Sequence, residues 1–208
     1  IPIRVGYDRK WGFLLNKRLK DLKFLGSKHE VEYNLDLVRS LGIETGERIF
    51  SIPVNEGDLE YIGRIISDLG LDNLNTLIAV HPWTSDPIKQ WPPENFLQLS
   101  QRLSRDFSCK VIIIGGKEEI GKSQKFCAGK ADLIDLTGKL TLKQLAAFFQ
   151  KCRCLVSNDS GPIHLASAVG TPVIALFRND IPGKTAKRWA PWGREHIVIE
   201  KDNLNKIT

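Results

Sequence analysis

Apolar and polar positions alternate in a regular order over most of the chain. From Thr76 onward, apolar runs of strand length are separated by stretches in which hydrophobic residues recur every three or four positions. The runs occupy residues 77–80, 111–114, 133–136, 153–157, 173–177 and 196–199. Strands that alternate with helices in this way are typical of a parallel sheet with helices on both faces. The pattern therefore predicts an α/β fold, in which ligands bind beyond the carboxyl ends of the strands.

The stretches between these runs carry helix start signals. Helices are predicted to begin at Pro92, Glu118, Thr141 and Pro162, where a proline, an acidic residue or a capping threonine suits the first turn. In the helix that begins at Thr141, four side chains are expected to pack inward: Leu142, Leu145, Ala146 and Phe149.

The region before Thr76 shows a different organisation. Residues 1–7 alternate as a strand, and residues 49–54 fit a short strand or an extended linker. Ser27–Glu30 fits a capping box for a helix that Gly42 ends. Asn55 caps a second helix that ends at Gly70 and is expected to face inward through Leu59, Ile62, Ile66 and Leu69.

The most informative stretch is 153–177, which is predicted to be strand, polar turn, helix and strand. A helix that opens with Ser160 and Gly161 presents free backbone N–H groups and the positive end of its dipole, which favours phosphate binding. Asp159 is placed to accept hydrogen bonds from sugar hydroxyls, and His164 lies one turn into the helix. The alternative is that Asp159 or Ser160 only caps the helix and that His164 is a core histidine.

Three other loops follow predicted strands or close the fold. Thr84, Ser85 and Lys89 could bind a diphosphate, or the loop 81–92 could be a plain surface loop with a packed Trp91. Glu119, or less directly Glu118, could bind the hydroxyls of a ribose, or could simply be acidic residues at a helix start. The aromatic loop 189–193 could stack on a sugar or cover the sheet.

Two of these motifs resemble glycosyltransferase family 9, the ADP-heptose:lipopolysaccharide heptosyltransferases and their relatives. The first motif consists of Asp159, Ser160, Gly161, His164, Ala168 and Pro172. The second is the strand, Thr84–Ser85 loop, Lys89 and Trp91–Pro92 that precede a helix. The chain departs from the family at Trp83, where the usual residue is glycine.

The resemblance implies a fold and a set of roles. The fold is one half of a GT-B glycosyltransferase of two facing Rossmann-like domains, with residues 1–72 as the end of an amino-terminal domain and linker and 73–208 as the donor-binding domain. Thr84, Ser85 and Lys89 contact the donor diphosphate. Glu119 binds the ribose, and Leu140, in the loop 136–141, packs on the adenine. Catalytic roles fall to Lys89, which neutralises the leaving group together with the helix at Ser160, and to Asp159, which holds the sugar.

The implied reaction is inverting transfer of heptose from ADP-heptose to the lipopolysaccharide inner core, with the ADP-sugar as substrate and neither a metal nor a cofactor. The family's general base lies near the start of its amino-terminal domain, and no strand with a glycine-rich loop corresponds to it here. Because the sequence begins with Ile1 rather than Met, we expect a trimmed piece that binds donor without turnover. The alternatives are a nucleotide-sugar-binding module without catalysis and a UDP-sugar transferase or epimerase of the same fold.

The charge of the chain is concentrated at one end. The 208 residues carry a net charge of +6, and residues 1–28 hold eight bases and two acids, so the rest of the chain is neutral. Leucines and Phe24 are interleaved with these bases, which favours contact with an anionic inner membrane or, equally, a solvated surface segment. No nucleic-acid-binding motif is present.

The remaining composition indicates a cytoplasmic protein. Hydrophobic residues make up 42% of the chain, enough for a core, and no apolar run is long enough to span a membrane. The four cysteines lack metal-ligand spacing, and Cys109 and Cys154, which lie in apolar strand runs, are expected to be reduced core residues. No signal peptide is recognised. We therefore expect a cytoplasmic location, with peripheral attachment to the inner face of the membrane through residues 1–28, and a lipopolysaccharide core or lipid A acceptor.

Overall fold

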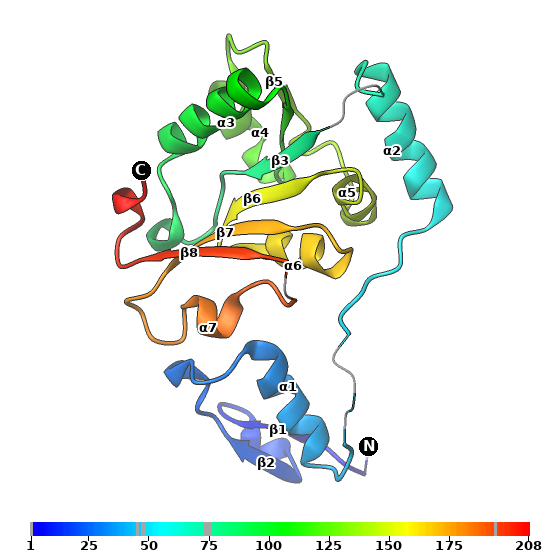
Figure 1. Cartoon of the computed structure of the whole chain (residues 1–208). Coiled ribbons are helices and arrows are strands. Elements are labelled where there is room, and N and C mark those ends of the chain that lie inside the picture. The colour runs from blue at the N-terminus through cyan, green and yellow to red at the C-terminus, as the bar shows by residue number, and fades with distance from the viewer. Residues whose placement is uncertain (1, 45, 47–48, 73–75, 194) are drawn as a thin grey trace. The chain divides into compact units, whose positions relative to one another are not determined.

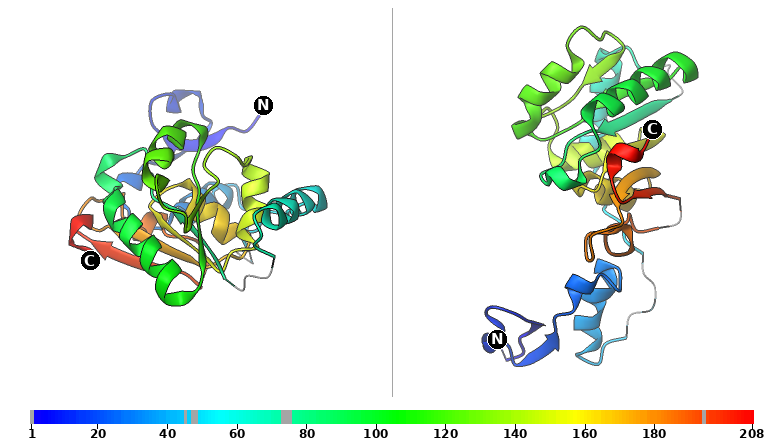
Figure 2. Two further views of the ribbon diagram at one scale, coloured as in Figure 1. Left: turned by 90° about the horizontal axis from the view of Figure 1, so that it is seen from above. Right: turned by 90° about the vertical axis from the view of Figure 1, so that its left-hand side faces the viewer.

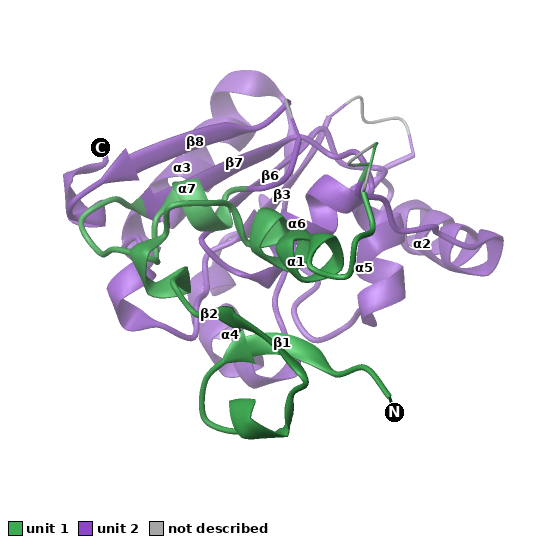
Figure 3. Ribbon diagram, turned by 90° about the horizontal axis from the view of Figure 1, so that it is seen from below, with its two compact units in different colours: residues 1–49, 178–190 green, residues 50–177, 191–208 purple. Residues whose placement is uncertain are grey.

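The computed structural model describes all residues except 1, 45, 47–48, 73–75 and 194. The chain divides into two compact units (Figure 3): unit 1 contains residues 1–49 and 178–190, and unit 2 contains residues 50–177 and 191–208. This division differs from the boundary expected at residue 72. Helix α2 (Glu56–Asp68) packs against α5 (Leu142–Phe149), so the region from residue 50 belongs to the sheet-containing unit.

Unit 2 is built on a six-stranded sheet of order β5-β4-β3-β6-β7-β8 (Figure 1). The strands are β3 (Leu77–His81), β4 (Lys110–Ile113), β5 (Leu133–Asp135), β6 (Cys154–Asn158), β7 (Val173–Arg178) and β8 (Ile197–Lys201). The ladders β5–β4, β4–β3, β3–β6 and β6–β7 are all parallel. The predicted α/β fold and each of its six strands are confirmed.

Helices cover both faces of this sheet, as the two views in Figure 2 show. Alternate strand residues point to opposite faces. On one face, Val80 and Ile113 pack with Phe96 of α3 (Pro93–Phe107) and Phe126 of α4 (Ile120–Cys127). The remaining helices of the unit are α2, α5 and α6 (Gly161–Ala168). The predicted helix at Glu118 begins as a 3-10 turn, Lys117–Glu119.

Local sequence signals set most of these helix ends. Thr141 and Gln144 form a reciprocal capping box at the start of α5. Asn55 accepts a hydrogen bond from the Asp58 amide at the start of α2, as predicted. Two packing predictions were wrong: Leu142, the first residue of α5, is 72% exposed, and Leu69, the C-cap of α2, is 41% exposed. Each lies at a helix end, where fewer neighbours cover a side chain.

The described residues of unit 1 form two short strands, two α-helices and two 3-10 helices, Gly12–Leu14 and Lys23–Leu25. Strand β1 (Val5–Asp8) pairs in parallel with β2 (Lys17–Lys20), near α1 (Glu30–Arg39) and α7 (Ala186–Trp189). Helix α1 is capped by His29, whose Nδ1 accepts a hydrogen bond from the Val31 amide, and not by Ser27 as predicted. Ser27 instead bonds to the hydroxyl of Tyr33. Residues 49–54 form no strand in the structure.

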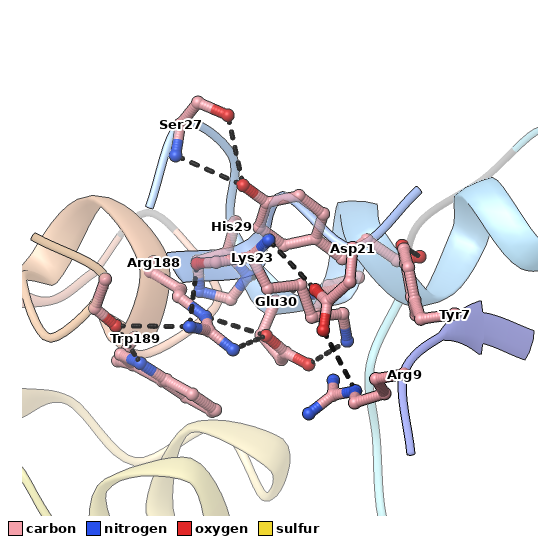
Figure 4. A network of polar contacts seen from close by, with 12 residues as sticks. Tyr7, Arg9, Asp21, Lys23, Ser27, His29, Glu30, Arg188 and Trp189 are labelled. Atoms are coloured by element: carbon pink, nitrogen blue, oxygen red, sulfur yellow. Dashed lines mark hydrogen bonds and ion pairs between the residues drawn. The ribbon is translucent and has the colours of Figure 1, made fainter. Parts of the chain in front are cut away.

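A network of charges ties residues 178–190 into unit 1 (Figure 4). The buried Lys23 places Nζ 2.5 Å from Oε1 of Glu30 and 4.5 Å from the ring centre of Tyr7. Arg188 donates to the other Glu30 oxygen at 2.9 Å and to the Lys23 carbonyl at 2.8 Å. Burial, followed by the nearby carboxylates, raises the pKa of Tyr7 to about 12. These contacts join two segments that lie about 160 positions apart in the sequence.

Within the described residues, no helix is both long and apolar enough to cross a bilayer.

Candidate functional site

The candidate site lies where the order of the strands reverses. The chain runs outward from β3 to β4 and β5, then returns to place β6 on the other side of β3. The loops that leave the carboxyl ends of β3 and β6 therefore diverge. The crevice between two such loops is the usual ligand site of these sheets, and we call this end of the sheet its carboxyl edge. His81 and Ser157 are register partners at this edge, so the two loops begin side by side.

Lys89 and Asp159 meet across this opening. Lys89 ends a 3-10 turn, Pro87–Lys89, in the loop after β3, and Asp159 directly follows β6. The Lys89 ammonium lies 2.5 Å from Oδ2 of Asp159. The Asp159 side chain is 7% exposed and that of Lys89 is 20% exposed, so the ammonium compensates a buried carboxylate while keeping access to solvent. Two residues predicted separately thus form one ion pair.

Asn158 fixes the loop that carries Lys89. Its side-chain oxygen accepts a hydrogen bond from the Trp91 amide at 2.9 Å, and its amide nitrogen donates to the Pro82 carbonyl at 3.2 Å. Asn158 is fully buried, so both bonds are shielded from water. The two ends of the loop are therefore attached to β6. Sequence reasoning placed Asn158 in the turn but gave it no role in the site.

The first turn of α6 has no side-chain cap. Ser160 is the N-cap residue, but its hydroxyl lies 3.1 Å from Nδ1 of His81 and 3.0 Å from Oγ of Ser157 instead of bonding to the helix. Gly161 is exposed, and a Cβ added there would meet no atom within 4 Å. The interpretation that Ser160 only caps the helix is wrong. The space beside Gly161 at the start of α6 is open, as an anion site requires, while in the same turn Pro162 has no N–H and the Ile163 amide donates to the Ser160 carbonyl.

His81 links this turn to Glu119. Its ring is buried, and Nε2 lies 3.6 Å from Oε2 of Glu119, which also accepts the Gly116 amide at 2.7 Å. Burial alone would raise the pKa of Glu119, but the interaction with His81 and the Gly116 hydrogen bond outweigh it and lower that pKa. Glu119 is therefore held as a carboxylate, the form that accepts hydrogen bonds from hydroxyls. Sequence reasoning missed His81, whose only signal was its place at the end of an apolar run.

The other predicted residues are distributed along the same edge. Thr84 is half-buried and its hydroxyl accepts a hydrogen bond from the Asp86 amide, whereas Ser85 is exposed. Leu140 is half-buried in the loop after β5, and His164 is half-buried on α6. The structure therefore brings Lys89, Asp159 and Ser160 into one cluster, extended through His81 to Glu119.

Trp83 occupies the position at which the family motif has glycine. Its ring is 4% exposed and packs edge-on against Phe126, with 5.6 Å between ring centres. The side chain therefore enters the core under the loop instead of projecting from it. The departure from the motif leaves Thr84 and Ser85 at the surface of the loop.

The cysteines and acidic residues form no metal-binding cluster: across the described part of the chain, no group of three or more His, Cys, Asp or Glu side chains could hold an ion. All four cysteines are free. Burial raises the pKa of Cys109, Cys127 and Cys154.

Comparison with known proteins shows the family of the chain. The model of glycosyltransferase family 9 (heptosyltransferase) matches residues 1–208. The chain is 27% identical over 192 residues to the lipopolysaccharide core heptosyltransferase OpsX of Haemophilus influenzae, covering 88% of this chain and 52% of the relative. It is 24% identical to lipopolysaccharide heptosyltransferase 3 of Escherichia coli, covering 100% of this chain and 60% of the relative. The chain thus spans about half the length of these relatives.

Solved structures give the same result for the fold. A family 9 glycosyltransferase from Veillonella parvula superimposes with a TM-score of 0.82 at 25% identity, covering 96% of this chain and 56% of that one. The E. coli ADP-heptose lps heptosyltransferase II superimposes with a TM-score of 0.81 at 22% identity, covering 100% of this chain and 66% of that one.

Proposed function

This chain belongs to glycosyltransferase family 9 (heptosyltransferase). From that premise we propose that the carboxyl ends of β3 and β6, where the strand order reverses, bind the ADP group of an ADP-sugar donor. The observation that carries the proposal is the Lys89–Asp159 pair beside the uncapped start of α6. The partly exposed ammonium of Lys89 and the positive end of the α6 dipole supply two sources of positive potential for a pyrophosphate. Thr84 and Ser85 add hydroxyl donors on the same loop.

The rest of the nucleotide is assigned to the neighbouring loops. Glu119, held as a carboxylate, accepts the ribose hydroxyls, and Leu140 packs on the adenine. Asp159 orients the transferred sugar, and His164 lies one turn into α6 from the phosphates. During transfer, the ammonium of Lys89 and the dipole of α6 stabilise the charge that develops on the departing diphosphate. The donor enters as a substrate, and the proposed reaction uses no further cofactor.

The proposed reaction is inverting transfer of heptose to a lipopolysaccharide inner-core acceptor in the cytoplasm. The names of the related heptosyltransferases support this choice of sugar and acceptor. Attachment to the inner face of the membrane, through the bases of residues 1–28, forms part of the proposal because the acceptor carries lipid A and an anionic surface attracts such bases.

Calorimetric titration of the 208-residue chain with ADP and UDP tests donor binding. We expect ADP to bind and UDP to bind at least tenfold more weakly. Equal affinities would favour the UDP-sugar alternative, and no heat with either nucleotide at millimolar concentration would refute the site. Release of ADP from ADP-heptose in the presence of an inner-core acceptor then separates an enzyme from a binding module.

A further inference from the structure

His81 is a buried polar residue that joins two parts of the candidate site. We propose that it is a positioning residue that couples the ribose-binding carboxylate of Glu119 to the phosphate-binding turn at Ser160. This inference rests on the proposed function, because it assumes that a nucleoside diphosphate occupies the edge of the sheet.

The position of His81 follows from the order of the strands. It is the last residue of β3, and β3 lies between β4, which precedes Glu119, and β6, which precedes Ser160. One ring nitrogen serves each neighbour: Nδ1 lies 3.1 Å from Oγ of Ser160, and Nε2 lies 3.6 Å from Oε2 of Glu119. A single side chain thus spans the point at which the two loops diverge.

The chemistry of the two partners selects the tautomer of the ring. At 3.6 Å the contact between Nε2 and Oε2 of Glu119 is electrostatic and longer than a hydrogen bond. Because a carboxylate only accepts, a proton on Nε2 is the arrangement that this contact favours. In a neutral imidazole, Nδ1 then accepts a hydrogen bond, and Ser160 at 3.1 Å is the nearer of two hydroxyls that can donate it, Ser157 at 3.3 Å being the other. The Asn158 carbonyl is the other acceptor within reach of both hydroxyls. The Glu119 carboxylate and the Ser160 hydroxyl are therefore connected through one ring, and the position of each constrains the other.

This connection has a consequence for phosphate binding. A serine at an N-cap normally turns its hydroxyl toward the amides of the first turn. Here the hydroxyl of Ser160 contacts His81 and Ser157, lies 3.1 Å from the Asn158 carbonyl to which it can donate, and makes no bond to α6. His81 thereby helps to keep the Ser160 side chain off the first turn of α6, which leaves that end of the helix open to an anion. Occupation of the ribose end, which fixes Glu119, is transmitted to the phosphate end by the same ring.

Two substitutions of His81 test the roles of its two ring nitrogens separately. In His81→Asn the shorter amide can reach the place of Nδ1, whereas in His81→Gln the longer amide can reach the place of Nε2. We would titrate the wild-type chain and both variants with ADP and with inorganic pyrophosphate. His81→Asn is expected to keep pyrophosphate affinity within about twofold and to lose roughly tenfold for ADP, since each tenfold change corresponds to about 1.4 kcal/mol. His81→Gln is expected to weaken both ligands, because the Ser160 hydroxyl is released to cap α6.

The outcomes distinguish the inference from its premise. If the wild-type chain binds neither ligand, the proposed function fails and the inference fails with it. If the wild type binds both and the two variants lose the same factor for both ligands, or lose nothing, His81 is only structural and the inference alone is overturned.

A second measurement leaves His81 intact, in case its variants do not fold. The double variant Glu119→Gln/Ser160→Ala is compared with its two single variants by ADP affinity. We expect the two losses to be non-additive by at least threefold, because both residues act through His81. The matched pair Glu119→Gln/Ser85→Ala uses an exposed serine and is expected to be additive. Additivity in both pairs would overturn the coupling.

Discussion

The ammonium of Lys89 lies 2.5 Å from the carboxylate of Asp159, although the two residues are separated by most of the helices of unit 2 along the sequence. The pair has two separable functions in our proposal. Its lysine neutralises the buried Asp159 carboxylate in the folded protein, and the same lysine supplies a cation to the donor diphosphate.

Removing the cation tests both functions. Lys89→Met leaves the Asp159 carboxylate buried without its ammonium partner, so we expect a loss of about 2 kcal/mol of stability and at least tenfold weaker ADP binding. Adding Asp159→Asn is expected to restore much of the stability but not the binding. Chemical denaturation and calorimetry measure the two effects. The exposed pair Lys206–Asp202 gives the control, since Lys206→Met is expected to change stability by under about 0.5 kcal/mol.

A substitution at Gly161 is expected to weaken ligand binding without destabilising the fold. Gly161 has no left-handed backbone, and a Cβ there meets no protein atom within 4 Å, so Gly161→Ala is expected to leave the melting temperature unchanged or slightly higher. The added methyl projects into the proposed phosphate site, so ADP affinity is expected to fall about tenfold or more. Unchanged affinity would contradict the placement of the phosphate.

Gly170→Ala is the control for Gly161→Ala, because it is expected to lower stability without changing ADP affinity. Gly170 ends α6 with φ of +83°, and a Cβ there is equally free of contacts. Gly170→Ala therefore differs from Gly161→Ala in backbone strain and in its distance from the site. We expect it to cost about 1 kcal/mol of stability with ADP affinity retained.

The lowered pKa of Glu119 predicts how stability depends on pH. A carboxyl whose pKa is lower in the folded state than its ordinary 4.5 stabilises the protein above that value, and this contribution is lost as the pH falls through the folded pKa. The stability difference between wild type and Glu119→Gln is thus expected to be larger at about pH 6 than at about pH 3. Denaturant titrations at the two pH values measure it, with the exposed neighbour Glu118→Gln as control. A difference independent of pH would show that Glu119 is not stabilised as a carboxylate.

Asn158 is expected to hold the Lys89 loop in place. Asn158→Ala leaves the Trp91 amide without its side-chain acceptor in a buried setting, which costs about 2 kcal/mol. Hydrogen exchange of the Trp91 amide should accelerate with the loss of stability, and ADP binding should weaken with it. Asn205→Ala, at an exposed residue, is the matched control. Retention of slow exchange at Trp91 in Asn158→Ala would contradict the proposed attachment.

The sequence by itself determined the elements and the edge of the sheet at which the site lies. Apolar runs of strand length, and start signals such as Asn55 and Thr141, depend on residues a few positions apart, and the structure confirms them. The turn Asp159–Gly161 was likewise placed correctly, because a strand, a polar turn and a helix follow directly from local sequence. Local signals were less reliable at helix ends, where Leu69 and Leu142 are exposed.

Only the tertiary structure decided which of these residues meet. The return of β6 to pair with β3 brings Lys89 to Asp159, places Asn158 under the loop, and puts His81 between Ser160 and Glu119. The return of residues 178–190 to unit 1 likewise depends on Arg188 and Glu30. Such contacts join positions far apart along the chain. Neither hydrophobic periodicity nor capping signals, which describe only near neighbours, contain the order of the strands that creates them.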